Sequence, residues 1–362
     1  MRRQNTTIAG SLLLICSIFT DCGTLSAQKA STLEIDREAT RLNPVDDGPI
    51  YKQALHNLSF DPTGKFLAAG QGTGRVFIWD LEKKELVHDI VAHEKWTFTI
   101  QFMSDGSRLI TGGGDNLIKI WDLSNPEEPK NVLAKHQGDV HAIVLNGDEK
   151  RLFSAGDDMV PLSWNLEAII GGEDPDESVV SMFQHPRQIP AMAISPDNQF
   201  LVTSARDGKI RVFDLRDLTL MHELAVHARD CITVRYIPGT PNIVSGGYEG
   251  TVQIWNARMG YKINEFAKLH NSVVCVDTSH DGKQVVAIDE KTMAIFQVEN
   301  PTIEPEVLVP ELVSDEQLSF IRFHPDGKRL FATTTLGRVF EISREELKIV
   351  NMFQAPMDEA NR

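Results

Sequence analysis

Seven short segments of this chain alternate apolar and polar residues and carry a large apolar side chain near their end. They cover residues 76–80, 118–122, 162–165, 210–214, 252–256, 293–297 and 339–343. Their anchors are Trp79, Trp121, Trp164, Phe213, Trp255, Phe296 and Ile342, spaced 42, 43, 49, 42, 41 and 46 residues apart. Because side chains alternate between the two faces of a strand, each segment is predicted to be a β-strand.

A turn sequence lies upstream of each of these strands. Pro62 and Gly64 precede Trp79, and Pro325 and Gly327 precede Ile342. Proline restricts φ and glycine accepts positive φ, so each turn is predicted to close a hairpin between two apolar runs. A repeat of this length, built from short strands and hairpins, is typical of a propeller. We therefore predict an all-β fold, a seven-bladed β-propeller of four-stranded antiparallel blades, over residues 51–354.

Four histidines keep a fixed distance from the anchors. His93, His136, His185 and His227 each lie 28 residues before the anchor of their repeat. Together with the repeat length, this pattern resembles the WD-repeat (beta-transducin-like) family. The resemblance implies a hydrogen-bonded chain of His, Ser or Thr, Asp and Trp inside a blade. Two repeats match all four positions, with His93, Thr111, Asp115 and Trp121 in one and His136, Ser154, Asp158 and Trp164 in the next.

The other repeats depart from this pattern. The repeat that ends at Phe213 has no indole N–H, and the repeat that ends at Trp255 has Glu249 where the Asp is expected. We expect weaker chains in these two repeats, because a buried polar group without a partner lowers stability. The first, sixth and seventh repeats are assigned from strand pattern and spacing alone.

The N-terminal residues have the pattern of a secretory signal peptide. Arg2 and Arg3 precede an apolar stretch at 8–19, and small residues at 25–27 precede Gln28. The alternatives are a buried helix or a membrane anchor, for which the apolar stretch is short. We expect cleavage after residue 27, a secreted or periplasmic protein of bacterial type, and no membrane span after cleavage. Residues 28–50 are predicted to be a polar leader, and 355–362 a frayed tail.

Charge disfavours nucleic acid as a partner. The formal net charge is −15, which repels phosphate backbones. Basic residues nevertheless concentrate in the fourth and fifth repeats, where they form either a solvated rim or an anion site. They are Arg187, Arg206, Lys209, Arg211, Arg216, Arg229 and Arg235. Acidic residues dominate 167–180, for which a mobile surface loop is predicted.

The sequence carries no motif for catalysis or for a cofactor. It has no His-Glu-x-x-His, no Cys-x-x-Cys pair, no phosphate-binding glycine loop and no nucleophile elbow. We expect no enzyme activity, no metal and no cofactor. His141 lies on a predicted innermost strand, where it is either a structural side chain or faces the central channel. Cys231 and Cys275 are expected to be buried free thiols, although a disulfide stays open.

The resemblance also indicates where a partner binds. Relatives of this fold bind partners through residues just after the loop His and just before the turn Asp. In this chain these are Trp96, Asp139, Gln188 and Asp230 in the loops, and Asp157, Arg206, Tyr248 and Asp289 in the turns. Trp96 is the only Trp outside the anchors, so it either anchors a partner or packs into the neighbouring loop.

These observations favour an exported, non-catalytic scaffold that binds a protein or peptide at the channel-mouth face. Two other classes stay open. One is an exported propeller enzyme, lactonase-like or hydrolase-like, and the other is a binder of a small ligand or glycan in the central channel.

Overall fold

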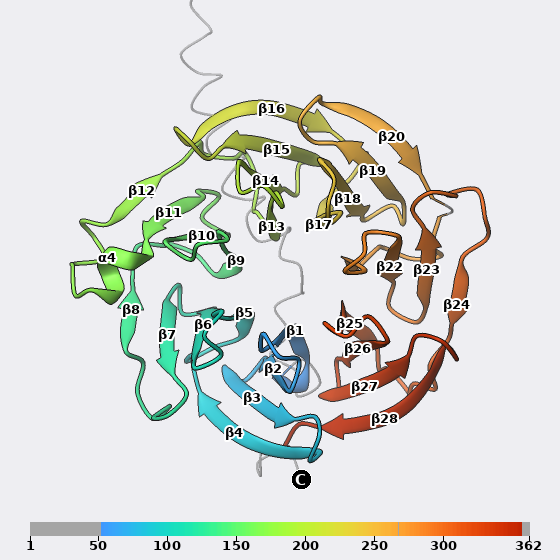
Figure 1. Ribbon diagram of the computed structural model, residues 1–362, viewed down its shortest axis with the longest axis horizontal. Coiled ribbons are helices and arrows are strands. Elements are labelled where there is room, and N and C mark those ends of the chain that lie inside the picture. The colour runs from blue at the N-terminus through green and yellow to red at the C-terminus, as the bar shows by residue number, and fades with distance from the viewer. Residues whose placement is uncertain (1–51, 267, 357–362) are drawn as a thin grey trace, which may run out of the picture. The chain divides into compact units, whose positions relative to one another are not determined.

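The computed structural model describes residues 52–266 and 268–356 (Figure 1). The described residues form seven four-stranded sheets, and each sheet is built from four consecutive antiparallel strands. The sheets are arranged as blades around one axis, and we number them 1 to 7 in chain order (Figure 1). The predicted all-β, seven-bladed propeller is therefore confirmed.

The first four blades cover the N-terminal part of the ring. Blade 1 contains β1 (Leu55–Phe60), β2 (Phe66–Gln71), β3 (Arg75–Asp80) and β4 (Glu85–Val91). Blade 2 contains β5 (Thr97–Phe102), β6 (Arg108–Gly113), β7 (Ile118–Asp122) and β8 (Asn131–Leu133). Blade 3 contains β9 (Val140–Leu145), β10 (Arg151–Gly156), β11 (Leu162–Asn165) and β12 (Val179–Ser181). Blade 4 contains β13 (Ala191–Ile194), β14 (Phe200–Ser204), β15 (Lys209–Asp214) and β16 (Thr219–Ala225).

The last three blades complete the ring. Blade 5 contains β17 (Cys231–Tyr236), β18 (Asn242–Gly247), β19 (Val252–Asn256) and β20 (Tyr261–Glu265). Blade 6 contains β21 (Cys275–Thr278), β22 (Gln284–Ile288), β23 (Met293–Gln297) and β24 (Glu306–Leu308). Blade 7 contains β25 (Leu318–Phe323), β26 (Arg329–Thr334), β27 (Arg338–Ser343) and β28 (Lys348–Gln354). All seven anchors lie on the third strand of their blade, including the aliphatic Ile342.

The core lies between the blades. The buried apolar residues form seven clusters, and each cluster joins two neighbouring blades. Trp121 of blade 2, for example, packs with Ile78 of blade 1, and Trp164 of blade 3 packs with Ile120 of blade 2. Each sheet is thus covered on both faces, and the apolar area removed from water stabilises the ring at about 25 cal/mol per Å². Cys231 and Cys275 are buried free thiols within these clusters.

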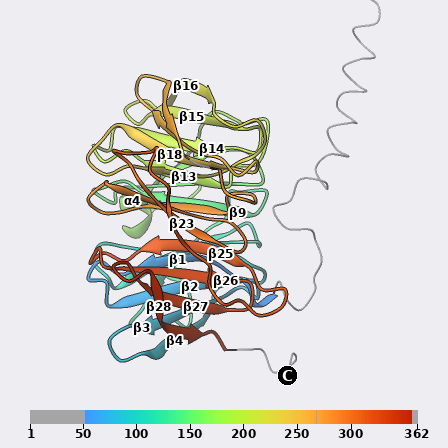
Figure 2. The ribbon, with the colours of Figure 1, turned by 90° about the vertical axis from the view of Figure 1, so that its right-hand side faces the viewer.

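Blade 7 closes the ring against blade 1 (Figures 1 and 2). Phe353 and Phe331 pack with Leu55, and the hydroxyls of Ser319 and Thr333 both donate to the Leu55 carbonyl, at 2.6 and 3.1 Å. The outermost strand of blade 7 is its own C-terminal strand β28. The proposed leader at 28–50 lies outside the described residues.

Two segments differ from the sequence-based expectation. The acidic run at 167–180 is predicted to be a mobile loop, yet it begins within a short helix, α4 (Leu166–Ile170). Leu166 and Ile169 are buried in the cluster between blades 2 and 3, which explains the ordering. Ala355, placed in the frayed tail by the sequence pattern, is buried, and its N–H donates to the Gly337 carbonyl at 2.9 Å. Residues 357–362 lie outside the described part of the chain.

Blades 2 and 3 contain the hydrogen-bonded chains that the resemblance implies. In blade 2, His93 Nδ1 lies 2.7 Å from Asp115, His93 Nε2 lies 2.8 Å from the Thr111 hydroxyl, and the Trp121 indole donates to that hydroxyl at 3.0 Å. The corresponding distances in blade 3 are 2.7, 2.6 and 2.8 Å, for His136, Asp158, Ser154 and Trp164. Burial lowers the pKa of His93, so the neutral ring donates to Asp115 and accepts from Thr111.

The chains of blades 4 and 5 take a different form. In blade 4 the buried Arg211 pairs with Asp207 at 2.6 Å, and His185 Nδ1 donates instead to the Phe183 carbonyl at 3.0 Å. In blade 5 His227 reaches Glu249 at 2.5 Å, but the Trp255 indole donates to Gln253 rather than to Ser245. A competing side chain on the third strand therefore breaks one link in each chain, and blade 4 also lacks the indole link because its anchor is Phe213.

The chain in blade 2 predicts unequal costs for two substitutions. Asp115→Ala should lower the free energy of unfolding by about 1–3 kcal/mol, because His93 loses a buried partner. Thr73→Ala should cost about 0.5–1 kcal/mol, because the Thr73 hydroxyl makes one partly buried hydrogen bond, to Gln71. Urea titration of both variants measures the difference, and equal shifts of the midpoint would contradict the assigned roles.

Candidate functional site

The predicted loop and turn residues meet in pairs at one end of the blades. In blade 3 the Asp157 N–H donates to the Asp139 carbonyl at 3.0 Å, and in blade 4 the Arg206 N–H donates to the Gln188 carbonyl at 3.0 Å. In blade 5 the Tyr248 N–H donates to the Asp230 carbonyl at 2.9 Å. Trp96 accepts in the same way from Gly114 in blade 2, at 2.9 Å. These contacts place the loop series and the turn series on one rim, which we call the channel mouth.

Aromatic rings connect the first three blades at this rim. His56 of β1 lies against Trp96, with ring centroids 4.8 Å apart, and Trp96 stacks on Phe98 of β5 at 5.7 Å. Phe98 in turn lies 4.4 Å from His141 of β9. Trp96 is half-buried, so one side of the indole packs on its neighbours and part of it reaches solvent. Both roles considered for Trp96 are therefore compatible with its position.

Carboxylates surround His141 in blade 3. Its Nε2 lies 2.9 Å from Asp157, and ligand atoms of Asp139, His141 and Asp157 all lie within 4.8 Å of one another. All three side chains are half-buried. Imidazole and carboxylate groups can ligate a divalent cation, so these residues form a group that could hold one. His141 faces this rim and forms an ion pair there when it is protonated.

Arg206 and Tyr248 extend the mouth to blades 4 and 5. The Arg206 side chain is 6% exposed, and its Nη1 lies 4.0 Å from Asp230 of blade 5. Burial lowers the pKa of Arg206, and Asp230 and Asp157 act in the opposite direction. Tyr248 is 43% exposed, and the Arg229 guanidinium lies 4.1 Å from its ring centroid. The mouth thus presents an exposed Arg–Tyr pair supported by a buried arginine.

Asp289 differs from the other predicted site residues. It is completely buried in the turn between β22 and β23 of blade 6. Its Oδ1 accepts the N–H groups of Lys291 and Thr292 at 2.9 and 2.7 Å, and its Oδ2 accepts the Asn271 N–H at 3.3 Å. This carboxylate organises the turn rather than facing a partner.

The sequence pattern missed two residues of the mouth, His56 and Phe98, and left the role of His141 open. His56 and Phe98 are the second residues of β1 and β5, and His141 is the second residue of β9. Comparing the innermost strands position by position would have grouped them. Arg229 was noted only as part of a basic cluster. Within that cluster Arg211 pairs with Asp207 and Glu223, and Arg216 pairs with Asp214, so most of its charge is neutralised locally.

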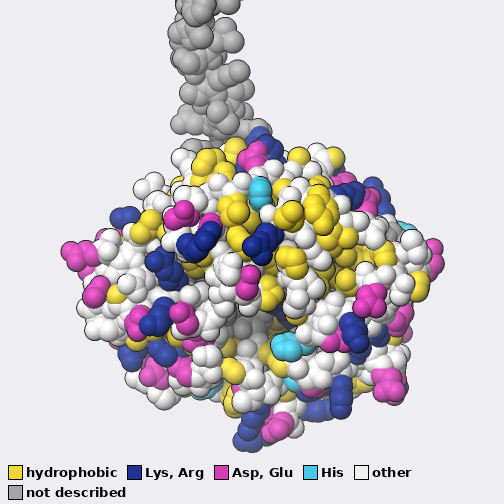
Figure 3. Space-filling view, turned by 45° about the horizontal axis from the view of Figure 1, so that its top comes forward, with side chains coloured by type: hydrophobic (Ala, Val, Ile, Leu, Met, Phe, Trp, Pro, Cys, Tyr) yellow, Lys and Arg dark blue, Asp and Glu magenta, His cyan; other side chains and the backbone are white. Residues whose placement is uncertain are grey.

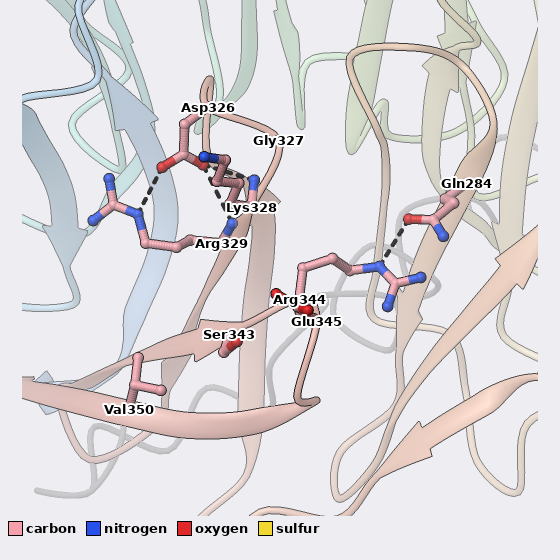
Figure 4. A pocket seen from close by; sticks show the side chains of 9 residues that line it. All are labelled: Gln284, Asp326, Gly327, Lys328, Arg329, Ser343, Arg344, Glu345 and Val350. Atoms are coloured by element: carbon pink, nitrogen blue, oxygen red, sulfur yellow. Dashed lines mark hydrogen bonds and ion pairs between the residues drawn. The ribbon is translucent and has the colours of Figure 1, made fainter.

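A surface cleft lies near the outer parts of blades 6 and 7, away from these residues. Its volume is about 740 Å³, and residues of the turns at 326–329 and 343–345 line it (Figure 4). Its arginines are already paired, since Arg329 contacts Asp326 and Glu341 while Arg344 contacts Gln284 and Glu306. The cleft therefore offers little unpaired charge to a ligand.

Apolar side chains also gather on the outer strands of blades 4 and 5. Met221 of β16 and Tyr261 and Ile263 of β20 are exposed, as is Met259 in the turn before β20. Figure 3 shows hydrophobic side chains concentrated on the side of the ring where these strands lie. Scattered exposed residues are common on edge strands, so this surface by itself does not identify a partner.

Comparison with known proteins identifies the repeat. The model of the WD domain, G-beta repeat, matches residues 49–80, 84–122, 177–214 and 218–256. These findings support a WD-repeat β-propeller. The matched repeat at 84–122 begins on the outermost strand of blade 1 and ends on the third strand of blade 2, so one WD repeat links two blades.

The similar proteins match this chain over only part of its length and part of their own. A U3 snoRNP-associated protein-like EMB2271 from Arabidopsis thaliana is 26% identical, over 47% of this chain and 38% of its own length. WD repeat-containing protein 37 from Homo sapiens is 27% identical, over 43% of this chain and 32% of its own. A guanine nucleotide-binding protein subunit beta from Oryza sativa subsp. japonica is 22% identical, over 59% of this chain and 58% of its own.

The chain thus spans about a third to three fifths of the length of these relatives. All three come from plants or animals, so they do not support the expected bacterial type. WD-repeat propellers typically serve as protein-interaction scaffolds. Within 52–266 and 268–356, the chain has no helix of the length and apolarity that a bilayer crossing requires.

The mouth of this propeller predicts a pH dependence of stability. Burial and the neighbouring His141 lower the pKa of His56 from 6.5 to about 4. The folded state then binds fewer protons than the unfolded state between about pH 4 and 6.5, so stability falls as the pH drops through this range. In His56→Gln, the decrease in the free energy of unfolding over this pH range should be smaller by about 1–3 kcal/mol.

Urea unfolding at several pH values measures the slope for the wild type and for His56→Gln. His222→Gln, on the outer strand β16, is the matched control for loss of an imidazole. An unchanged slope in His56→Gln would contradict the assignment to His56.

Proposed function

We propose that this WD-repeat propeller is an exported, non-catalytic scaffold that binds a protein or peptide partner at the channel mouth. The observation that carries the proposal is the exposed Tyr248 ring beneath Arg229, close to the buried Arg206. Tyrosine and arginine are enriched among residues that dominate binding energy, because they bury a large area and keep a polar group. Trp96 adds a second aromatic surface on the same rim.

The fixed backbone supports this role. Tyr248 and Trp96 are each tied by a backbone hydrogen bond to the opposite series of their blade. The Arg206–Asp230 contact links blades 4 and 5, and the His141–Asp157 contact holds the turn of blade 3 against its innermost strand. A preorganised surface loses little conformational entropy on binding, which favours affinity. Asp139, Asp157 and Asp230 add negative charge, so the partner should present basic or hydrogen-bond-donating groups here.

A small-ligand or glycan binder, or a lactonase-like or hydrolase-like enzyme, is the second candidate. The group of Asp139, His141 and Asp157 is the observation that favours it, because these side chains could hold a cation that polarises a ligand. Such a ligand would bind the purified protein without any partner protein. If added small ligands and divalent cations leave the binding of a partner protein unchanged, the scaffold is favoured.

Substitution at the mouth tests the scaffold. Tyr248→Ala should weaken partner binding by about 2 kcal/mol, roughly 30-fold, as loss of a desolvated aromatic anchor does. The melting temperature should stay nearly unchanged, because the ring is exposed. Lys150→Ala is the control, since Lys150 lies in the hairpin between β9 and β10 and pairs with Glu167.

The partner is first recovered by cross-linking and affinity capture with the wild-type protein, and its affinity for each variant is then measured by calorimetry. Trp96→Ala and Arg206→Gln are further probes of the same rim. If Tyr248→Ala and Trp96→Ala both bind as tightly as Lys150→Ala, the partner uses another face.

Export is the second part of the proposal, and it rests on the sequence of residues 1–27, which lie outside the described residues. Arginines followed by an apolar stretch and small residues before Gln28 are typical of a cleaved secretory signal. We expect the mature protein to begin near Gln28 and to occur in a secreted or periplasmic fraction. N-terminal sequencing of the protein from its native cells measures this, and an intact Met1 on intracellular protein would refute export.

A further inference from the structure

Charged side chains occupy one level of the central channel. In every blade one residue of the innermost strand pairs with the third residue of the second strand, so these residues are structurally equivalent. They are Ser59, Gln101, Val144, Ala193, Arg235, Asp277 and Arg322. The three charged members lie on consecutive blades, 5, 6 and 7.

The two arginines share one carboxylate. Arg235 Nε and Arg322 Nη1 each lie 3.6 Å from the same oxygen of Asp277. The other Asp277 oxygen accepts the Phe323 N–H at 2.8 Å, which ties blade 6 to blade 7. One carboxylate therefore faces two guanidinium groups, and this level of the channel keeps a net positive charge in a chain whose formal net charge is −15.

The guanidinium donors are not fully used by the protein. Among residues 52–266 and 268–356, Nε of Arg235 and Nε of Arg322 are buried and find no hydrogen-bond partner. Arg235 donates through Nη1 to the Val234 carbonyl at 3.3 Å, and Arg322 lies over the Phe320 ring. Leaving a buried donor of a charged group unsatisfied is costly. Burial, and to a lesser extent the neighbouring Arg322, lower the pKa of Arg235 to about 10.

We propose that Arg235 and Arg322 bind a small oxyanion of the phosphate or sulfate type in the central channel. Guanidinium groups match the oxygens of such anions with paired N–H donors. Because both groups approach the same Asp277 oxygen at 3.6 Å, they lie close enough for one tetrahedral anion to contact both. The two side chains are 18% and 29% exposed although their Nε atoms are buried, so a small solute reaches other parts of these side chains first.

This site differs from the channel mouth and does not depend on the proposed partner. Its residues lie near the far ends of β17, β21 and β25, whereas the mouth residues lie at the start of the innermost strands and in the loops before them. The ligand is a single small anion, because the negative charge of the whole chain opposes polyanions such as nucleic acid. The competing explanation is that Arg235, Asp277 and Arg322 only clamp three blades together.

Thermal unfolding with added inorganic phosphate distinguishes these explanations. At matched ionic strength, phosphate and sulfate should raise the melting temperature of the wild type above its value in chloride, because a ligand of the folded state stabilises it. Acetate should act much more weakly, since it carries one negative charge. Calorimetry should show at least a tenfold loss of phosphate affinity for Arg322→Gln and an intermediate loss for Arg322→Lys.

Arg344→Gln, which removes a paired arginine from the cleft of blades 6 and 7, should keep the wild-type response. Arg235→Gln should lose phosphate affinity as Arg322→Gln does. If Arg235→Gln does not fold, the test rests on Arg322→Gln, because Arg322 is the more exposed of the two. No phosphate-specific shift in the wild type, or an equal shift in Arg322→Gln, would overturn the proposal and leave a structural clamp. An equal effect of acetate would overturn the assignment to a phosphate-type or sulfate-type anion.

Discussion

The apolar contact between neighbouring blades is the interaction on which the rest of this structure depends. A four-stranded sheet with two apolar faces cannot bury both of them alone, and closing the ring covers every blade on both sides. The seven inter-blade clusters show this directly, including the cluster of Leu55 with Phe331 and Phe353 that joins the last blade to the first. Closure also removes the unpaired faces that an open stack would expose.

Polar side chains inside the blades follow from this dense packing. A polar group buried inside a blade is tolerated at low energetic cost only if each of its donors and acceptors has a hydrogen-bond partner. Blades 2 and 3 meet this condition with His, hydroxyl, Asp and Trp. Blade 4 meets it only in part: Arg211 pairs with Asp207 and His185 with a backbone carbonyl, while Nε of Arg211 is buried without a partner among the described residues. The family pattern is thus one solution to a general requirement.

The same ring geometry brings together groups with functional potential. The innermost strands run side by side around the axis, so residues from different repeats meet at the mouth and at the level of Arg235, Asp277 and Arg322. The mouth is rich in aromatic rings and carboxylates, whereas the inner level carries excess positive charge. These two environments favour different ligands, a protein or peptide at the rim and a small anion inside.

Residue spacing alone predicts the number of blades, the position of the anchors on the third strands and the chains of blades 2 and 3. These features repeat at a nearly constant period and depend on contacts within one blade, so spacing along the chain reveals them. The meeting of His56 with Trp96, the loss of Asp207 from its chain and the burial of Asp289 were decided by the tertiary structure. They depend on which side chains of different strands and blades come into contact in the folded ring and compete for the same partners. Residue spacing along the chain does not contain that information.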